Sequence, residues 1–170
     1  MQNKNIFSHI FFKYFLVFIF IFLCFFFIKN NFSKNLDTDK IQNIKIAGKI
    51  LKVELALTEK EQEQGLSGRK ELKEDEGMLF VFNHIGQYSF WMKDMNFPID
   101  IIWIGPASTQ GGEDLNVVYI KKNALPESYP DTFLPDQNAK YILEVNASFS
   151  EKNNLKVGDK VEFCSLKACH

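Results

Sequence analysis

Apolar and polar residues alternate along the sequence just after residue 48. In "KILKVELAL" (49–57), apolar residues at 51, 53, 55 and 57 are separated by charged or small residues. A period of two is typical of a strand with one buried face. Thr58 and Glu61 then have the spacing of a helix capping box, and Gly65 is a natural helix end. The pattern predicts a strand followed by a helix of about two turns.

Six further short apolar runs follow, at 78–82, 88–92, 99–104, 117–121, 141–145 and 160–163. They are rich in β-branched and aromatic residues and are bounded by Gly, Pro, Asn and Asp, as strands are. Few helical segments intervene, which disfavours a parallel βαβ sheet. We therefore expect a mainly β domain, an antiparallel sandwich or barrel with one or two short helices.

The N-terminal segment has a different pattern. Residues 14–28, "YFLVFIFIFLCFFFI", carry no charge. Extension of this run back to residue 6 adds only three polar residues, Ser8, His9 and the charged Lys13. A helix of 15 to 23 residues is about 22 to 34 Å long, which matches a bilayer core of about 30 Å. Lys4 and Lys13 precede the run without an acid, so the N-terminus is expected in the cytoplasm and the domain across the membrane.

A cleaved signal peptide is the competing interpretation of this segment. The exit "FFFIKNNFSKN" has no small-residue cleavage site, and Leu23 precedes Cys24 where a lipoprotein signal has a small residue. We therefore expect one transmembrane helix within residues 1–29, contacting the membrane through 6–28, a polar linker at 30–40 and an extracytoplasmic β-domain at 41–170. Both interpretations place the domain outside the cytoplasm.

Charge excludes one class of partner. The chain has a formal net charge of −1, and its first 29 residues hold three lysines and no acid. The remainder therefore carries 17 basic and 21 acidic residues. A mildly acidic domain without a basic stripe or a glycine-rich phosphate loop is not expected to bind nucleic acid.

Charged residues interrupt two apolar runs in "FWMKDMNFPIDIIWIG" (90–105). Strand alternation places Trp91 beside Lys93, and it places Asp100 on a face with two isoleucines. An ionised carboxylate in such surroundings costs several kcal/mol unless it is paired. We expect Asp100 to be buried or half-buried and paired with Lys93 or Arg69.

Glu144 in "YILEV" raises the same question on another strand. Two interpretations stay open, namely structural ion pairs at the rim of a β-core and a ligand site. The candidate ligand-binding residues are Arg69, Trp91, Met92, Lys93, Asp100 and Glu144. General acid and base chemistry would pair Asp100 with Asp94 or Glu144, but spacing alone does not support it, and we predict no catalytic residue.

Cysteine, histidine and methionine give weaker signals. Cys164 and Cys169 in the terminal "CSLKACH" are close enough in sequence for a short-loop disulfide outside the cytoplasm. The alternative is a zinc or copper site that includes His170. His84 with the methionines at 78, 92 and 95 is a further soft-metal alternative, although methionine more often fills a core. We predict no metal and no cofactor.

Four stretches together resemble a known family. "GLSGRKELKEDEGMLFVF", "FWMKDMNFPIDIIWI", "YILEV" and "LKVGDKVEF" have an order and spacing similar to the domain of unknown function 192 family, over about residues 50–163. Members are typically small prokaryotic proteins, often exported or anchored. The resemblance implies a mostly β, jelly-roll-like sandwich and carries no established activity.

The resemblance also marks positions. The family pattern falls on Arg69, Gly77, Met78, Phe80, Trp91, Met92, Lys93, Pro98, Asp100, Glu144, Gly158 and Asp159. The chain departs from it at Ser67 and Gly68, where Met and a bulky residue are usual, and at Asp94, which replaces the commoner Asn. It departs again at Glu127, where many relatives have Cys. The departures at 67–68 and at Asp94 are expected to alter a pocket wall.

Three functions are consistent with the sequence. The first is a membrane-tethered module that binds an unknown ligand or partner of the cell envelope. The second is an envelope hydrolase that uses Asp100 or Glu144, and the third is a structural accessory protein without pocket chemistry. We favour the binding module over an enzyme because no catalytic signature is present.

Overall fold

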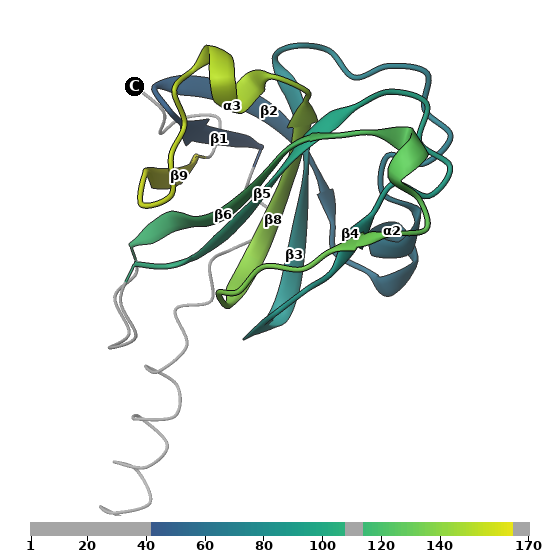
Figure 1. Ribbon diagram of the computed structural model, residues 1–170. Helices are drawn as coiled ribbons and strands as arrows, with labels where there is room; N and C mark the ends of the chain where they lie inside the picture. The colour runs from purple at the N-terminus through teal and green to yellow at the C-terminus, as the bar shows by residue number, and fades with distance from the viewer. Residues whose placement is uncertain (1–41, 108–113, 165–170) are drawn as a thin grey trace, which may run out of the picture. The chain divides into compact units, whose positions relative to one another are not determined.

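The computed structural model describes residues 42–107 and 114–164 (Figure 1). The elements in chain order are β1 (Asn43–Ile46), β2 (Lys49–Ala56), α2 (Glu59–Gln64), β3 (Glu76–Gly86), β4 (Phe90–Trp91), β5 (Ile99–Pro106), β6 (Leu115–Ala124), the short 3-10 helix η2 (Pro126–Ser128), β7 (Thr132–Phe133), β8 (Ala139–Asn146), α3 (Phe149–Lys152) and β9 (Lys160–Cys164). The expected anchor at 1–29 and linker at 30–40 lie outside these residues. Within the described part, no helix is long and apolar enough to cross a membrane.

Seven strands form a closed barrel in the order β1-β2-β3-β8-β5-β6-β9, and β4 pairs with β7 in a separate two-stranded sheet. The expected mainly β fold is confirmed, as a barrel with two short α-helices rather than as a jelly-roll sandwich. The expectation of a wholly antiparallel sheet is wrong at one place, because β2 and β3 are parallel. A tight hairpin cannot join parallel strands, so α2 and residues 65–75 provide the crossover.

The helix predicted after β2 is present with its capping box. The N–H of Glu61 donates to Thr58 Oγ1 at 3.3 Å, and the N–H of Thr58 donates to Glu61 Oε2 at 2.9 Å. The strand predicted at 88–92 is shorter, because the chain turns at Asp94, which has a φ of 54°. β1, β7 and α3 are each of four residues or fewer, too short for the sequence pattern to predict them.

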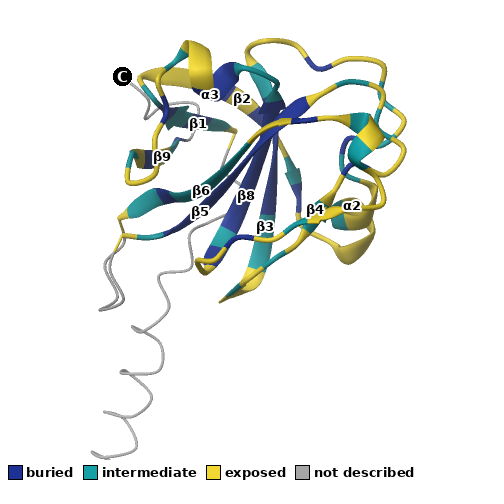
Figure 2. Cartoon of the chain, in the orientation of Figure 1, coloured by how far each residue is buried: buried dark blue, intermediate teal, exposed yellow. Residues whose placement is uncertain are grey.

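The barrel wall is buried on both faces where β5 and β8 run (Figure 2). The inner core receives side chains from all seven barrel strands: Ile44, Ile46, Leu51, Val53, Leu79, Ile102, Ile104, Val117, Tyr141, Leu143, Val145 and Val161, with Phe149 and Leu155. The outer core lies on the other face of β3, β5 and β8: Ala56, Leu66, Leu72, Met78, Phe80, Met92, Ile99, Ile101, Trp103, Ala124, Ala139 and Ile142. The central strands are therefore apolar at almost every position.

Asp100 is the buried polar exception on β5, and it joins three segments of the fold. Its Oδ1 accepts hydrogen bonds from the N–H of Asn123 at 2.9 Å and of Ser148 at 3.2 Å. Its Oδ2 accepts one from the N–H of Ser150 at 2.8 Å. The end of β6 and the start of α3 are thereby both attached to the central strand.

Local backbone geometry provides these donors. Asn123 has a φ of 48° and lies at a bulge, where two residues of β6 face Asp100 alone on β5. Ser148, with a φ of 66°, is the N-cap of α3, and its side chain makes no capping bond. The carboxylate of Asp100 takes that role from a distant strand.

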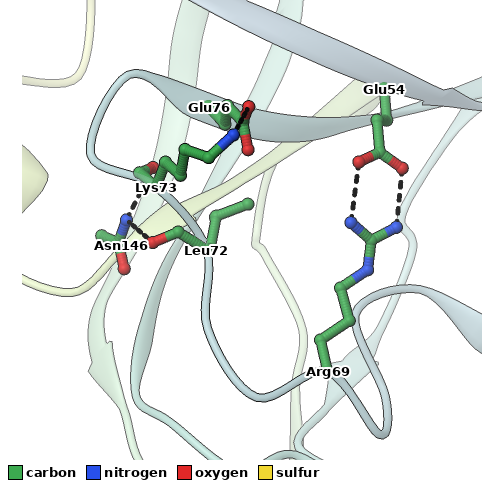
Figure 3. Close-up of polar contacts among 6 residues, drawn as sticks. All are labelled: Glu54, Arg69, Leu72, Lys73, Glu76 and Asn146. Carbon is green, nitrogen blue, oxygen red and sulfur yellow. Dashed lines mark hydrogen bonds and ion pairs between the residues drawn. The ribbon is translucent and has the colours of Figure 1, made fainter.

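The predicted ion pair of Asp100 with Lys93 or Arg69 is wrong, whereas its burial is confirmed. Arg69 instead forms two hydrogen bonds with Glu54, of 2.7 and 2.6 Å (Figure 3). Lys93 is exposed in the turn after β4. Because β5 is covered on both faces, backbone N–H groups at a bulge and a helix start replace a cation as partners.

We expect Asp100→Asn to lower the free energy of unfolding. The amide offers one acceptor oxygen, and its NH2 group would face an N–H that has lost its partner. A buried unsatisfied donor costs about 1 to 3 kcal/mol, so the loss in a urea titration should clearly exceed about 1 kcal/mol.

The exposed Asp136 provides the matched control, and Asp136→Asn should stay within about 0.5 kcal/mol of wild type. In double-mutant cycles, neither Lys93→Met nor Arg69→Met should be coupled to Asp100→Asn. Equal stability of the Asp100 and Asp136 variants would contradict the role assigned to the buried carboxylate.

Candidate functional site

A cavity of about 410 Å³ lies beside α2, next to the outer core. Its lining comes from α2, from the segment just after it, from β3, from the residues around β4 and from β8. The lining residues are Glu59, Gln62, Glu63, Gln64, Gly65, Leu66, Ser67, Phe80, Phe82, Gln87, Tyr88, Ser89, Phe90, Trp91, Met95 and Glu144. Sites for small ligands typically have this size.

Glu144 is the buried carboxyl group of this cavity. It lies on β8, opposite Met78 of β3 and Ile101 of β5, and only 4% of it is exposed. Its Oε2 has no hydrogen-bond partner among the described residues. A Cβ atom at Gly65 would lie 3.8 Å from Oε2 and 3.2 Å from Phe80 Cζ, so the chain passes directly over the carboxyl group at the end of α2.

Burial raises the pKa of Glu144 to about 8, from an ordinary value of 4.5. The Arg69 guanidinium acts in the opposite direction but does not compensate for the loss of water. A carboxyl group with this pKa is mostly protonated at neutral pH, when it can donate one hydrogen bond and still accept others. Such displaced pKa values are more frequent at functional sites than elsewhere.

Arg69 anchors the segment between α2 and β3 (Figure 3). Its pair with Glu54 is partly exposed and lowers the pKa of that carboxyl group. Further along the segment, Asn146 Nδ2 donates to the carbonyl oxygens of Leu72 and Lys73 at 2.7 and 2.9 Å. The segment that covers Glu144 is therefore held from β2 on one side and from β8 on the other.

Aromatic side chains form much of the remaining wall. Phe82 and Tyr88 are stacked with ring centroids 3.6 Å apart, and Phe80 meets Phe90 edge-on at 4.8 Å. Trp91 is 48% exposed. A large indole ring that is half-exposed at a cavity is available for contact with a ligand.

The structure brings two of the six predicted ligand-binding residues to this cavity, Trp91 and Glu144. Arg69 lines an adjoining hollow that shares Gln64 and Gly65 with the cavity. Met92 is buried in the outer core and Lys93 is exposed.

Asp100 is not part of this lining. It faces Val145, whereas its neighbour Ile101 faces Glu144, so the two carboxyl groups lie on opposite faces of the β5–β8 pair. The acid pair that the hydrolase hypothesis named does not converge in one cleft.

The contribution of α2 to the cavity does not follow from the sequence pattern. Its polar residues at 59, 62 and 63 have helical spacing and line the cavity. That spacing was visible in the sequence, but a polar helix face is ordinarily a solvated one, and nothing in the pattern indicated a cavity beside it. The sequence predicts only that Gly65 ends the helix, and Gly65 is indeed the C-cap of α2.

Three residues at which the chain departs from the family pattern, Ser67, Gly68 and Asp94, lie close together. Ser67 Oγ donates to the carbonyl of Lys93 at 2.7 Å, and the N–H of Gly68 donates to the carbonyl of Asp94 at 2.8 Å. Ser67 also lines the cavity. These residues connect the segment after α2 with the turn after β4.

The other candidate sites are less developed. Within 42–107 and 114–164, no three His, Cys, Asp or Glu residues are grouped to hold a metal ion. Met78 and Met92 are core residues, and His84 is exposed. Cys169 and His170 lie outside the described residues, so the disulfide with Cys164 stays a prediction.

Fold and cavity together define a small, mainly β barrel with a ligand-sized cavity on the outside of its wall. The chain belongs to the DUF192 family, described as "Uncharacterized ACR", whose profile matches residues 42–163. The suspected membership is confirmed. Among curated proteins, none is significantly similar to this chain.

Solved structures similar to the chain include two bacterial proteins. A protein of unknown function from Novosphingobium aromaticivorans is 31% identical, with a TM-score of 0.64, over 72% of this chain and 85% of that one. A protein from Sinorhizobium meliloti, described as "a putative transcription regulator", is 29% identical, with a TM-score of 0.62, over 71% of this chain and 90% of that one. The likeness extends to most of the described domain.

We expect Glu144 to make stability depend on pH. Between about pH 4.5 and 8, the folded state keeps a proton that the unfolded state has lost. The free energy of unfolding should therefore fall as pH rises through this window, by about 1.4 kcal/mol per unit near its middle. Urea titrations at pH 5, 6 and 7 measure this fall, and Glu144→Gln should lack it.

Two variants make this measurement specific. Glu151→Gln changes an exposed glutamate and should retain the wild-type pH dependence. Because Arg69 lowers the pKa of Glu144, Arg69→Met should extend the fall to higher pH. Parallel stability curves for wild type and Glu144→Gln would show that Glu144 does not titrate in this way.

Proposed function

We propose that this protein is a ligand-binding module whose site is the cavity beside α2. One observation carries the proposal: the buried Glu144 lines a ligand-sized cavity, and its Oε2 has no hydrogen-bond partner among the described residues. Buried polar groups are nearly always satisfied in native proteins, so an unsatisfied one requires an explanation. A ligand that bonds to this group provides one, and the half-exposed Trp91 provides an apolar contact.

Binding is better supported than hydrolysis. The hydrolase hypothesis named Asp100 and Glu144, and Asp100 is instead hydrogen-bonded to three backbone N–H groups on the opposite face of the β5–β8 pair. The structural-accessory hypothesis gives no role to the cavity. Regulation of transcription, which the description of the Sinorhizobium protein names, is not proposed here, because the cavity lining contains three glutamates and no Lys, Arg or His.

We further propose that residues 6–28 tether the domain to the cell membrane, with the N-terminus in the cytoplasm and the β-domain outside. The support is the uncharged run at 14–28 with lysines before it. The ligand would then be a component of the cell envelope or of its surroundings.

Binding is tested by a thermal-shift screen of the full-length protein against neutral, anionic and cationic small molecules, including sugars and peptides. A specific ligand at a hundredfold excess over its dissociation constant stabilises the protein by about 2.7 kcal/mol. Trp91→Ala should weaken a ligand of the cavity by about tenfold, since a well-packed aromatic contact is worth roughly 1 to 2 kcal/mol.

The control is Val157→Ala, which shortens an exposed apolar residue outside the cavity lining and should leave the affinity unchanged. A hit that binds wild type and Trp91→Ala equally does not occupy the cavity. A screen in which no compound of any charge stabilises the protein would contradict the binding function.

Membrane tethering predicts that the full-length chain sediments with the membrane fraction and resists a carbonate wash. Mass spectrometry of this material should show an intact N-terminal segment, and deletion of residues 1–29 should release the protein. Recovery of a mature soluble form that begins near residue 30 would instead indicate a cleaved signal peptide.

A further inference from the structure

The cavity beside α2 carries acidic groups and no basic one. Its lining includes Glu59 and Glu63 of α2 and Glu144 of β8, with no Lys, Arg or His in this set of described residues. Arg69, whose charge acts on Glu144, is held by Glu54 through two hydrogen bonds. The lining therefore favours a positively charged occupant.

Hydrogen bonding within the lining points in the same direction. Four polar side chains of the lining donate hydrogen bonds of 2.7 to 3.3 Å to backbone carbonyl oxygens: Gln62, Gln64, Ser67 and Tyr88. Gln62 uses Nε2 twice, and the single protons of Ser67 and Tyr88 are committed. Apart from the second N–H of Gln64, these groups retain acceptor capacity, which suits a ligand that donates hydrogen bonds.

The aromatic wall is consistent with a cation as well. Phe82, Tyr88, Phe90 and Trp91 all line the cavity, and Trp91 is half-exposed. The faces of aromatic rings attract cations, and indole does so most strongly. A group that combines positive charge with N–H donors matches the carboxyl groups, the acceptors and the rings together.

We propose that the cavity binds a small organic amine in its protonated, ammonium form, an inference that rests on the binding function proposed above. The ammonium group pairs with Glu144, and the carbon skeleton of the amine lies against Trp91 and its aromatic neighbours. The cavity volume of about 410 Å³ admits a molecule of this kind.

Binding of an ammonium group is coupled to the protonation of Glu144. Arg69, after α2, is the charged group that acts on Glu144, and the other titratable groups in the cavity lining are Glu59 and Glu63 of α2 and Tyr88 before β4. The adjacent strands β3 and β5 present apolar residues to it. Because a cation stabilises the ionised carboxylate, its binding at neutral pH should release a proton from Glu144.

Three probes with one ring and three charges test this inference: benzylammonium chloride, benzyl alcohol and sodium benzoate. They are titrated into the full-length protein by calorimetry at constant ionic strength. Benzylammonium should bind at least about tenfold more tightly than benzyl alcohol, and benzoate most weakly. At pH 7 its binding heat should vary with the ionisation enthalpy of the buffer, which reports proton release.

Glu144→Gln should reduce the preference for benzylammonium over benzyl alcohol to less than about threefold and abolish the buffer dependence. Glu151→Gln, which changes an exposed glutamate outside the cavity lining, should retain both. Because the Gln variant is expected to be no less stable than wild type at pH 7, a folding defect does not obscure the comparison.

Failure to bind benzylammonium, equal binding of the alcohol, a preference for benzoate or an unchanged preference in Glu144→Gln would each overturn the assignment of an amine. None of these results would remove the binding function, which is decided by the screen across all charges and by Trp91→Ala. The two proposals can therefore fail separately.

Discussion

The fold depends on how the central strands satisfy polar groups in a wall that is buried on both faces. β5 is covered by the inner core on one side and the outer core on the other. Asp100 lies in this strand and accepts three backbone N–H bonds, from a bulge in β6 and from the start of α3. The carboxylate attaches the end of β6 and the start of α3 to β5, because these N–H groups have no partner in the sheet ladder.

Burial of the barrel wall on both faces also determines where the candidate site lies. Where the outer core lacks a covering strand, α2 and the segment after it lie over β3 and β8, held by Arg69 and Asn146. A short polar helix does not fill the space that a strand or a long helix would fill. The cavity is what remains between this cover and the aromatic residues around β4.

Much of this arrangement follows from the sequence. Alternation predicts β2, the capping box predicts α2, and the isoleucines around Asp100 require its burial. The partners of Asp100 do not follow, because its donors belong to backbone that is 23 to 50 residues away, and two of them, Asn123 and Ser148, have positive φ. The pattern of side chains predicts which face of a strand is buried. It does not predict where a backbone N–H group lies, because that depends on bulges and turns. The cavity likewise depends on tertiary packing of α2, which local periodicity does not specify.

Two buried carboxyl groups on adjacent strands therefore have opposite characters. Asp100 accepts hydrogen bonds at both of its oxygens and joins three segments of the fold. Glu144 Oε2, by contrast, has no partner among the described residues, and burial raises the pKa of its carboxyl group to about 8. A glutamine or a leucine at 144 would remove the cost of burying an ionisable group, since an apolar replacement of an unsatisfied polar group is often stabilising. Stability alone thus explains Asp100 but not Glu144, and the unsatisfied group lies where a ligand-sized cavity meets the barrel wall. Proteins depart from local stability most often at functional sites, and this departure at Glu144 is the physical reason for proposing the binding site there.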